Sequence, residues 1–241
     1  MRRREFILTS AGATVGLVAC GGGGGDSTSQ PTAPSQPSSP TQPTPVKQYT
    51  TNFQGNENPL SEGGTWSNNG LDWTVVQKLN GVAQGTLTGT VGYDDSYALL
   101  SAFTSYQSAS AVIHIASGID ASCTHEVEIL LRATDAPHSV KCYECNLSFD
   151  GQYCEIVRWN GKVGDFTYLA RGAPSAAPRN GDTFKAVAQG SLIIVYLNDV
   201  EIIRATDTNY PTGNPGIGFY RGAPCGSNAD YGFSSFSAQS F

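Results

Sequence analysis

Two glutamates alternate with apolar residues in the run 126–132, where Glu126 and Glu128 flank Val127. Successive side chains of a β-strand point to opposite faces, so both carboxylates are predicted on one face with their Cα atoms about 6.5 to 7 Å apart. Two carboxylates at that separation have the geometry for paired acid and base chemistry. The spacing therefore permits such chemistry on this strand.

The runs 142–148 and 153–159 alternate in the same way. Val127, Ile129, Leu131, Cys145, Leu147, Cys154 and Ile156 are expected to face a core. The opposite, polar face of the three runs collects carboxylates, an amide, a guanidinium and aromatic rings: Glu126, Glu128, Arg132, Glu144, Asn146, Tyr153, Glu155 and Trp159. A tryptophan on a solvated face is unusual, so we interpret this face as a binding surface.

The dipeptide Asp150-Gly151 is a turn signal between the second and third runs, because both residue types tolerate positive φ. A two-residue turn here pairs residues whose numbers sum to 301. Asn146 then lies opposite Glu155, and Cys142 lies opposite Trp159. Two strands are thus predicted to share one polar surface, which the run 126–132 extends if it pairs alongside them.

Short β-rich runs bounded by Gly, Asn, Asp and Pro recur along the chain, and almost no window repeats apolar residues at helical spacing. Thirteen strands are predicted, at 73–78, 83–88, 96–104, 108–115, 124–132, 142–148, 153–159, 166–170, 183–189, 191–197, 200–206, 216–221 and 231–238. Strands with one apolar face each pack most economically as two sheets. The predicted fold class is therefore all-β, an antiparallel β-sandwich of the jelly-roll type, with the polar face on its exposed concave sheet.

The N-terminus has a basic segment followed by a short apolar stretch, which predicts a signal peptide over residues 1–19. Arg3-Arg4-Glu5-Phe6-Ile7 resembles a twin-arginine export signal, and Leu17-Val18-Ala19-Cys20 resembles the lipobox of bacterial lipoproteins. The resemblance implies that Cys20 is lipidated and becomes the mature N-terminus. Acyl chains on Cys20 would anchor an exported protein to the cell envelope, on its periplasmic or cell-surface face.

Residues 20–47 are almost wholly Gly, Ser, Thr, Gln and Pro after Cys20, which predicts a disordered tether. The remaining residues, 48–241, are enough for one folded head. Of the 14 basic and 20 acidic residues, the signal peptide holds three and one, so the mature chain has a formal charge of −8. An acidic head without a basic cluster is not expected to bind nucleic acid, and membrane contact is expected only through the lipid anchor.

Five cysteines besides Cys20 stay available for disulfides, and their pairing is left open: Cys123, Cys142, Cys145, Cys154 and Cys225. Cys142 and Cys145 have C-x-x-C spacing, but residues three apart in a strand point to opposite faces. A zinc or redox site is therefore not expected there, and Cys145 and Cys154 are interpreted as small core residues.

The C-terminal part of the chain carries a familiar pattern in Asp182-Thr183-Phe184-Lys185-Ala186, Leu192-Ile193-Ile194-Val195-Tyr196-Leu197-Asn198-Asp199 and Gly213-Asn214-Pro215-Gly216-Ile217-Gly218. These runs resemble the closing strands of concanavalin A-like lectin/glucanase domains, which are laminin-G-like jelly rolls. Tyr143-Glu144-Cys145-Asn146 and Ile156-Val157-Arg158-Trp159-Asn160-Gly161 are similar to the middle strands of the same group. The resemblance covers about residues 53–238 and implies a carbohydrate ligand, a polysaccharide or glycan, on the concave sheet.

A sugar-binding face needs planar rings to stack on a pyranose, with carboxylates or amides to accept hydrogen bonds from vicinal hydroxyl groups. Arg132, Asn146, Tyr153, Glu155 and Trp159 are the predicted ligand-binding residues. The first hypothesis is a lectin-like binding domain without catalysis. The alternatives are a glycan-cleaving enzyme and an adhesive domain that recognises protein.

If the chain is an enzyme, Glu126, Glu128 and Glu144 are its predicted catalytic residues. Glucanases of this fold are recognised by three acidic residues that alternate on one strand, and here Leu130 takes the third place. A polysaccharide lyase would instead need a Tyr or His base beside an Arg. His125 and Tyr143 offer that chemistry but are predicted on the core side.

No cofactor and no catalytic metal site are predicted, since no His, Cys and carboxylate spacing suggests one. The oxygen-rich segments Asn56-Glu57-Asn58 and Tyr93-Asp94-Asp95 are compatible with a structural calcium ion, as domains of this fold often have, and equally with turn chemistry. Arg158 is predicted on the core side, either paired with a carboxylate such as Asp165 or turned to the rim by a bulge.

Overall fold

A computed structural model describes residues 44–88, 95–118, 120, 123–222 and 226–241. The predicted signal peptide, Cys20 and most of the tether lie outside these residues. The described chain is all-β apart from one short 3-10 turn, η1 (Asn228–Asp230). No helix in this part of the chain is long and apolar enough to cross a membrane.

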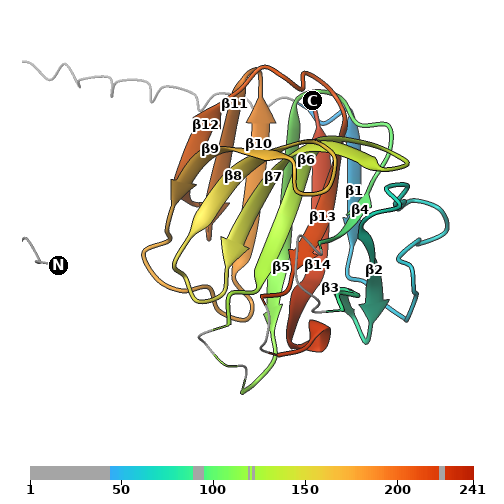
Figure 1. Ribbon diagram of the computed structural model, residues 1–241, viewed down its shortest axis with the longest axis vertical. Coiled ribbons are helices and arrows are strands. Elements are labelled where there is room, and N and C mark those ends of the chain that lie inside the picture. The colour runs from blue at the N-terminus through green and yellow to red at the C-terminus, as the bar shows by residue number, and fades with distance from the viewer. Residues whose placement is uncertain (1–43, 89–94, 119, 121–122, 223–225) are drawn as a thin grey trace, which may run out of the picture. The chain divides into compact units, whose positions relative to one another are not determined.

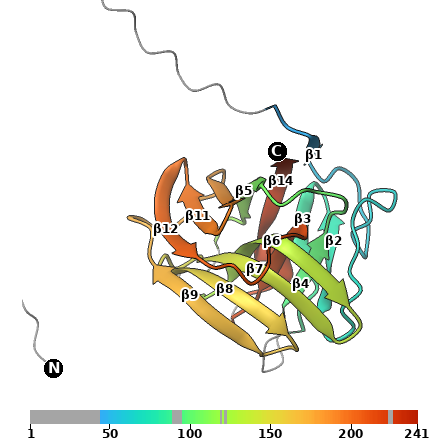
Figure 2. The ribbon, with the colours of Figure 1, turned by 90° about the horizontal axis from the view of Figure 1, so that it is seen from above.

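The strands form two packed layers, which are visible in Figures 1 and 2. The first layer runs in the order β12 (Val200–Thr206), β11 (Leu192–Leu197), β10 (Thr183–Gln189), β5 (Gln107–Ile115), β14 (Tyr231–Ser240), β3 (Val82–Gly85) and β2 (Thr74–Leu79), with β1 (Lys47–Thr51) also paired to β14. The second layer runs in the order β4 (Ser96–Leu99), β13 (Asn214–Tyr220), β6 (Glu126–Ala136), β7 (Ser139–Ser148), β8 (Cys154–Gly161) and β9 (Phe166–Gly172). A parallel pairing of β2 with β4 joins the layers, and every other pairing is antiparallel.

All thirteen predicted strands have a counterpart, and the predicted β-sandwich is confirmed. The largest differences at the ends are in the predicted strand 96–104, which stops at Leu99, and in the predicted strand 124–132, which continues to Ala136. The strand that the sequence pattern missed is β1, which begins at Lys47, where the predicted tether ends. Its residues are mostly polar and alternate between half-buried and exposed, so it lacks the apolar pattern by which the other strands are recognised.

The inter-sheet core contains the residues that alternation assigned to it. Val127, Ile129 and Leu131 of β6 are fully buried, together with Cys145 and Leu147 of β7. They pack in one cluster with Phe184, Ile193 and Val195 of the opposite layer. The polar side chains of β6, β7 and β8 therefore point away from this core.

The hairpin between β7 and β8 has the predicted register. Asn146 pairs with Glu155 and Cys142 pairs with Trp159, as a turn at Asp150-Gly151 requires. Gly151 adopts a φ of +69° at this turn, a conformation that favours glycine. β6 pairs with the other edge of β7, so the run 126–132 does extend the polar surface.

Arg132 does not share that surface, and the prediction that it lies beside Glu126 and Glu128 is wrong. The β6–β7 ladder has a bulge between Leu131 and Thr134, and Arg132 takes a φ of +51° within it. Its guanidinium donates hydrogen bonds to the backbone carbonyls of Ser105 and Tyr210. A bulge changes the alternation that strand parity assumes, so parity fails at this residue.

The cysteines follow the core interpretation. Cys142, Cys145 and Cys154 are free and buried, with Cys142 and Cys145 in separate clusters on opposite faces of β7. The C-x-x-C spacing therefore forms no common site. Cys123 is disulfide-bonded, and Cys20 and Cys225 lie outside the described residues.

Candidate functional site

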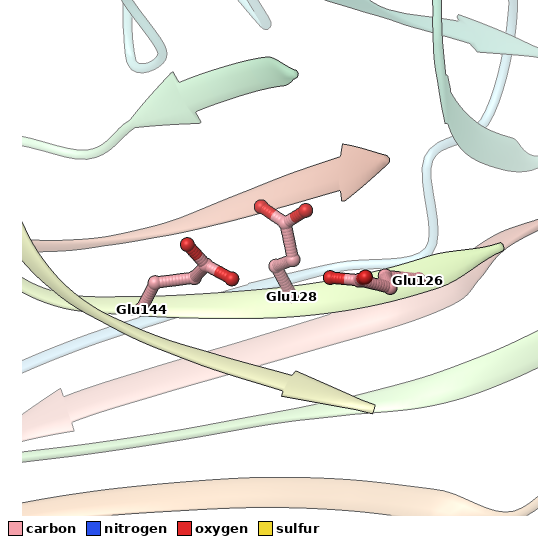
Figure 3. Close-up of side chains that lie close together, drawn as sticks. All are labelled: Glu126, Glu128 and Glu144. Atoms are coloured by element: carbon pink, nitrogen blue, oxygen red, sulfur yellow. The ribbon is translucent and has the colours of Figure 1, made fainter. Parts of the chain in front are cut away.

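Three carboxylates meet on the outer face of β6 and β7. Glu126 and Glu128 come from β6, and Glu144 comes from β7, where it pairs with Leu130. One oxygen atom of each carboxylate lies within 4.8 Å of the others. Figure 3 shows the Glu128 side chain between those of Glu126 and Glu144. β7 therefore supplies, as Glu144, the third acid that β6 lacks because Leu130 takes its place.

Neighbouring side chains hold two of the three carboxylates. Tyr153 donates its hydroxyl hydrogen to Glu126. Asn146 donates its amide to Oε1 of Glu144 over 2.6 Å, and the indole N–H of Trp159 donates to Oε2. These donors fix the orientation of both carboxylates before any ligand arrives.

The third carboxylate, that of Glu128, has a different environment. Glu128 is only 1 % exposed, and its Oε2 is buried without a hydrogen-bond partner in the part of the chain that the structure describes. It faces Gly218 of β13, and a Cβ at that position would collide with Oε2. The absent side chain of Gly218 thus makes the room that Glu128 occupies.

Burial raises the pKa values of all three groups, and neighbouring charges raise them further. Desolvation is the largest cause in each, and the charge of Glu144 is the next cause for both Glu126 and Glu128, whose pKa values lie well above the ordinary range. The pKa of Glu144 rises to about 7; hydrogen bonds from Asn146 and Trp159 offset part of the desolvation, and the charge of Glu155 adds to it. The three groups therefore hold their protons more tightly than free carboxyl groups do.

The cluster borders an open cleft of about 480 Å³, which we call the acidic cleft. The residues that line it are Asp95, Thr124, Glu126, Glu144, Asn146, Tyr153, Glu155, Val157, Trp159, Phe166, Tyr168 and Tyr220. Six of the predicted site residues line the acidic cleft: Glu126, Glu144, Asn146, Tyr153, Glu155 and Trp159. Glu128 is buried beside Glu126 and Glu144 but does not line the cleft, and Arg132 lies elsewhere. The structure therefore brings the predicted site residues together, with the exception of Arg132.

Trp159 lines the acidic cleft but is not the solvated ring that the sequence pattern predicts. It is 6 % exposed and stacks on Trp73, with ring centroids 5.9 Å apart and planes inclined by 16°. Tyr97 packs edge-on against it. A second apolar cluster, built on the outer face of the sheet, therefore covers most of this tryptophan.

β9 presents the accessible ring. Tyr168 is 58 % exposed, lines the acidic cleft and packs edge-on against Phe166. Tyr168 pairs with Val157 of β8, and Phe166 pairs with Trp159, so both rings lie on the outer face of the sheet. Neither ring is among the predicted site residues, because the predicted polar surface ends at β8.

Arg171 of β9 is a further missed residue. It pairs with Glu155 over 3.1 Å and lies over the Tyr153 ring, 4.9 Å from its centroid. Tyr168 and Arg171 are three residues apart, and a bulge between Ile156 and Val157 brings both to the same face. No feature of the sequence marks that bulge.

Other candidate residues have structural roles. Arg158 pairs with Asp207 rather than Asp165, and Tyr143 donates to the same carboxylate. His125 and Tyr143 are buried on the core side, as predicted, so neither lines the acidic cleft. Neither of the two residues that could act as the base of a lyase therefore lies in the acidic cleft.

The predicted calcium segments are only partly described. Glu57 accepts hydrogen bonds from the backbone of Ser61 and Glu62 and pairs with Lys78. Asn56 accepts a hydrogen bond from the backbone of Asn80. Turn chemistry accounts for these oxygens, while Tyr93 and Asp94 lie outside the described residues.

The sequence matches no known family profile, and no curated protein matches it. Solved structures share the fold. The carbohydrate-binding module CBM66 from Bacillus subtilis is 17 % identical, with 75 % of this chain and 95 % of that one covered at a TM-score of 0.50. Porphyranase B from Zobellia galactanivorans is 10 % identical (84 % and 97 % covered, TM-score 0.53), and a glycoside hydrolase family 16 endo-glucanase from Bacteroides ovatus is 8 % identical (79 % and 99 % covered, TM-score 0.50). These likenesses confirm the concanavalin A-like jelly roll.

Proposed function

We propose that this chain binds a glycan in the acidic cleft. The observation that carries the proposal is an exposed ring, Tyr168, at an open cleft whose floor offers oriented carboxylates. The ring can stack on the apolar face of a sugar, and Glu126, Glu144 and Glu155 can accept hydrogen bonds from its hydroxyl groups. The carbohydrate-binding module, the endo-glucanase and the porphyranase that share this fold support this assignment.

The negative charge of the acidic cleft favours some classes of glycan over others. Asp95, Glu126, Glu144 and Glu155 line it, and Arg171 reaches only Glu155. A sulfated or uronate polymer would bring further negative charge to this surface. We therefore expect neutral glycans, or glycans with amino groups, to bind more tightly than anionic ones.

Replacement of Tyr168 by Ala tests the binding proposal. We expect glycan affinity to fall on the order of tenfold, which corresponds to about 1.4 kcal/mol, while the fold persists because this ring is mostly exposed. Glycan array screening would identify a ligand, and calorimetry would compare the variants. Tyr196→Ala, on β11 in the opposite layer, is the matched control and should bind as the wild type does. Equal affinity in Tyr168→Ala would refute the cleft assignment.

Glycoside hydrolysis is a second candidate function, and the carboxylate cluster favours it. Hydrogen bonds from Asn146 and Trp159 stabilise the charged form of Glu144, which suits a nucleophile or base. Glu126 also lines the cleft, and burial raises its pKa well above the ordinary range, which suits an acid. The carboxylate oxygens lie within 4.8 Å of one another, close to the roughly 5 to 5.5 Å separation of retaining enzymes and below the roughly 6.5 to 9.5 Å of inverting ones, so hydrolysis here would retain the anomeric configuration.

Prolonged incubation with the bound glycan separates the two functions. A binding domain produces no new reducing ends, whereas a hydrolase produces them, and Glu144→Gln should abolish their release while the variant still binds the glycan with reduced affinity. A lyase would give unsaturated products. Tyr153 is a poor lyase base, because it donates to Glu126 and burial raises its pKa above the ordinary value.

We also propose that Cys20 anchors the exported protein through acyl chains, on the resemblance of Leu17-Val18-Ala19-Cys20 to a lipobox. Metabolic labelling with a palmitate analogue should mark the wild type and not Cys20→Ala. The variant should also leave the membrane fraction. Labelling of the variant would refute the assignment of Cys20.

A further inference from the structure

We propose that Glu126, Glu128 and Glu144 bind a calcium ion at the floor of the acidic cleft. This proposal goes beyond glycan binding and does not depend on it. The cluster supplies only carboxylate oxygens, which are the ligands of hard divalent cations. The ligand spacing within one strand does not indicate a metal site, because two ligands come from β6 and the third from β7.

The geometry of the three oxygens fits calcium. Atoms that all lie within 4.8 Å of one another have a common point no more than about 2.8 Å from each, the largest separation divided by the square root of three. Calcium ligands lie about 2.3 to 2.6 Å from the ion. Shifts of a few tenths of an ångström therefore complete the coordination, and waters from the cleft fill the remaining positions. Magnesium, at about 2.1 Å, would need a larger contraction of the cluster.

An independent observation points to a missing ligand. Oε2 of Glu128 is buried and has no hydrogen-bond partner among the described residues. The carboxylate lies between its two neighbours (Figure 3) and is closed off from bulk solvent, with 1 % of the residue exposed. A buried carboxylate oxygen without a partner is costly, and a cation beside it removes that cost.

The charges around the three carboxylates also favour a bound cation. None of the ion pairs found within the described ranges involves Glu126, Glu128 or Glu144, and the nearby Arg171 is paired with Glu155. One divalent ion would neutralise two of the three negative charges. It can enter through the acidic cleft, because Glu126 and Glu144 both line that cleft.

Calorimetric titration of the chelator-treated, purified chain with calcium chloride tests the proposal. We expect one equivalent to bind with a dissociation constant below about 1 mM and the melting temperature to rise by several degrees at saturation. Glu128→Gln should weaken binding at least tenfold, and Glu201→Gln, which alters an exposed pair with Arg204, should not change it. Gly218→Ala keeps all three charges but displaces the Glu128 carboxylate, and it should also weaken binding.

Circular dichroism of each variant establishes that it is folded. A folded wild type that shows neither heat nor a thermal shift with 5 mM calcium chloride would overturn the proposal, as would binding that Glu128→Gln and Gly218→Ala leave unchanged. Tighter binding of magnesium than of calcium would overturn the choice of ion. Calcium binding without any glycan ligand would leave this site standing while the proposed function fails.

Discussion

Replacement of Glu144 by Gln should remove part of the pH dependence of the free energy of unfolding. Burial raises the pKa of Glu144 from an ordinary value of 4.5 to about 7 in the folded state. The folded protein therefore holds this proton at pH values where the unfolded chain has lost it. The resulting stability is fully present below pH 4.5 and is lost as the pH rises through 7.

The magnitude follows from that shift. The pKa rises from 4.5 to about 7, which at 1.36 kcal/mol per pH unit gives about 3 kcal/mol, roughly three quarters of it lost between pH 5 and pH 8. Glu144→Gln has no proton to lose, so relative to the wild type it should gain about 2 to 3 kcal/mol over this interval. The variant also loses one hydrogen bond, because its amide has one acceptor oxygen where Glu144 offers one each to Asn146 and Trp159, and that cost is the same at every pH.

Urea denaturation followed by tryptophan fluorescence measures this difference at pH 5, 6, 7 and 8. A chelator is present throughout, because a bound cation would hold Glu144 ionised. The interval avoids lower pH, where Glu62 and Asp207, whose pKa values are lowered, lose their own stabilising interactions. Glu201→Gln is the control and should follow the wild type, since the pKa of Glu201 is lowered and that group is already ionised at pH 5.

The reasoning would be refuted if the stability difference between Glu144→Gln and the wild type changed by less than about 0.5 kcal/mol from pH 5 to pH 8. That result would mean that Glu144 is ionised in the folded protein at pH 5 despite its burial. It would also remove the pKa argument for the second candidate function.

Three further substitutions have defined outcomes. Trp159→Ala should destabilise the fold by about 3 to 5 kcal/mol in thermal or urea unfolding, because the ring is buried against Trp73 and Tyr97; a stable variant would mean that the second apolar cluster contributes little. Arg132→Met should cost about 1 to 3 kcal/mol by leaving the carbonyls of Ser105 and Tyr210 unpaired, with glycan affinity unchanged in calorimetry. Gly151→Ala should cost at least about 1 kcal/mol in urea unfolding, since its Cβ would lie 2.7 Å from Cα of Ala177 at a φ of +69°; an unchanged midpoint would show that the turn relaxes freely.

Alternation predicted the layers well because it reports burial directly. Val127, Ile129 and Cys145 lie in the core for the reason that their spacing indicated, and the turn at Asp150-Gly151 fixed the register of β7 and β8. The same rule failed at Arg132, where the chain inserts an extra residue. Local patterns cannot reveal a bulge whose cause is a contact distant in sequence, such as the bond from the Arg132 backbone to Gln107.

The polar face was predicted in its residues but not in its environment. Glu128, Glu144 and Trp159 point away from the core as expected, yet each is almost wholly buried; Trp73 and Tyr97 from distant segments pack on Trp159, and Glu128 lies against Gly218 of β13. The sequence predicts Glu144 on the same face, but its approach to Glu126 and Glu128 depends on the β6–β7 pairing, which the sequence leaves open. Strand order, rather than spacing along the chain, decides which acids meet.

The cluster is hard to explain as a structural feature. The charge of Glu144 raises the pKa values of Glu126 and Glu128, and an oxygen of Glu128 is buried without a partner in the described part of the chain, so both departures oppose stability. An apolar residue at position 128 would fill the same space without that cost. Such a conflict between local chemistry and the fold is expected where a site must act on a ligand. The position of the cluster beside an open cleft and an exposed tyrosine is what the proposed binding of a cation, a sugar or both would require.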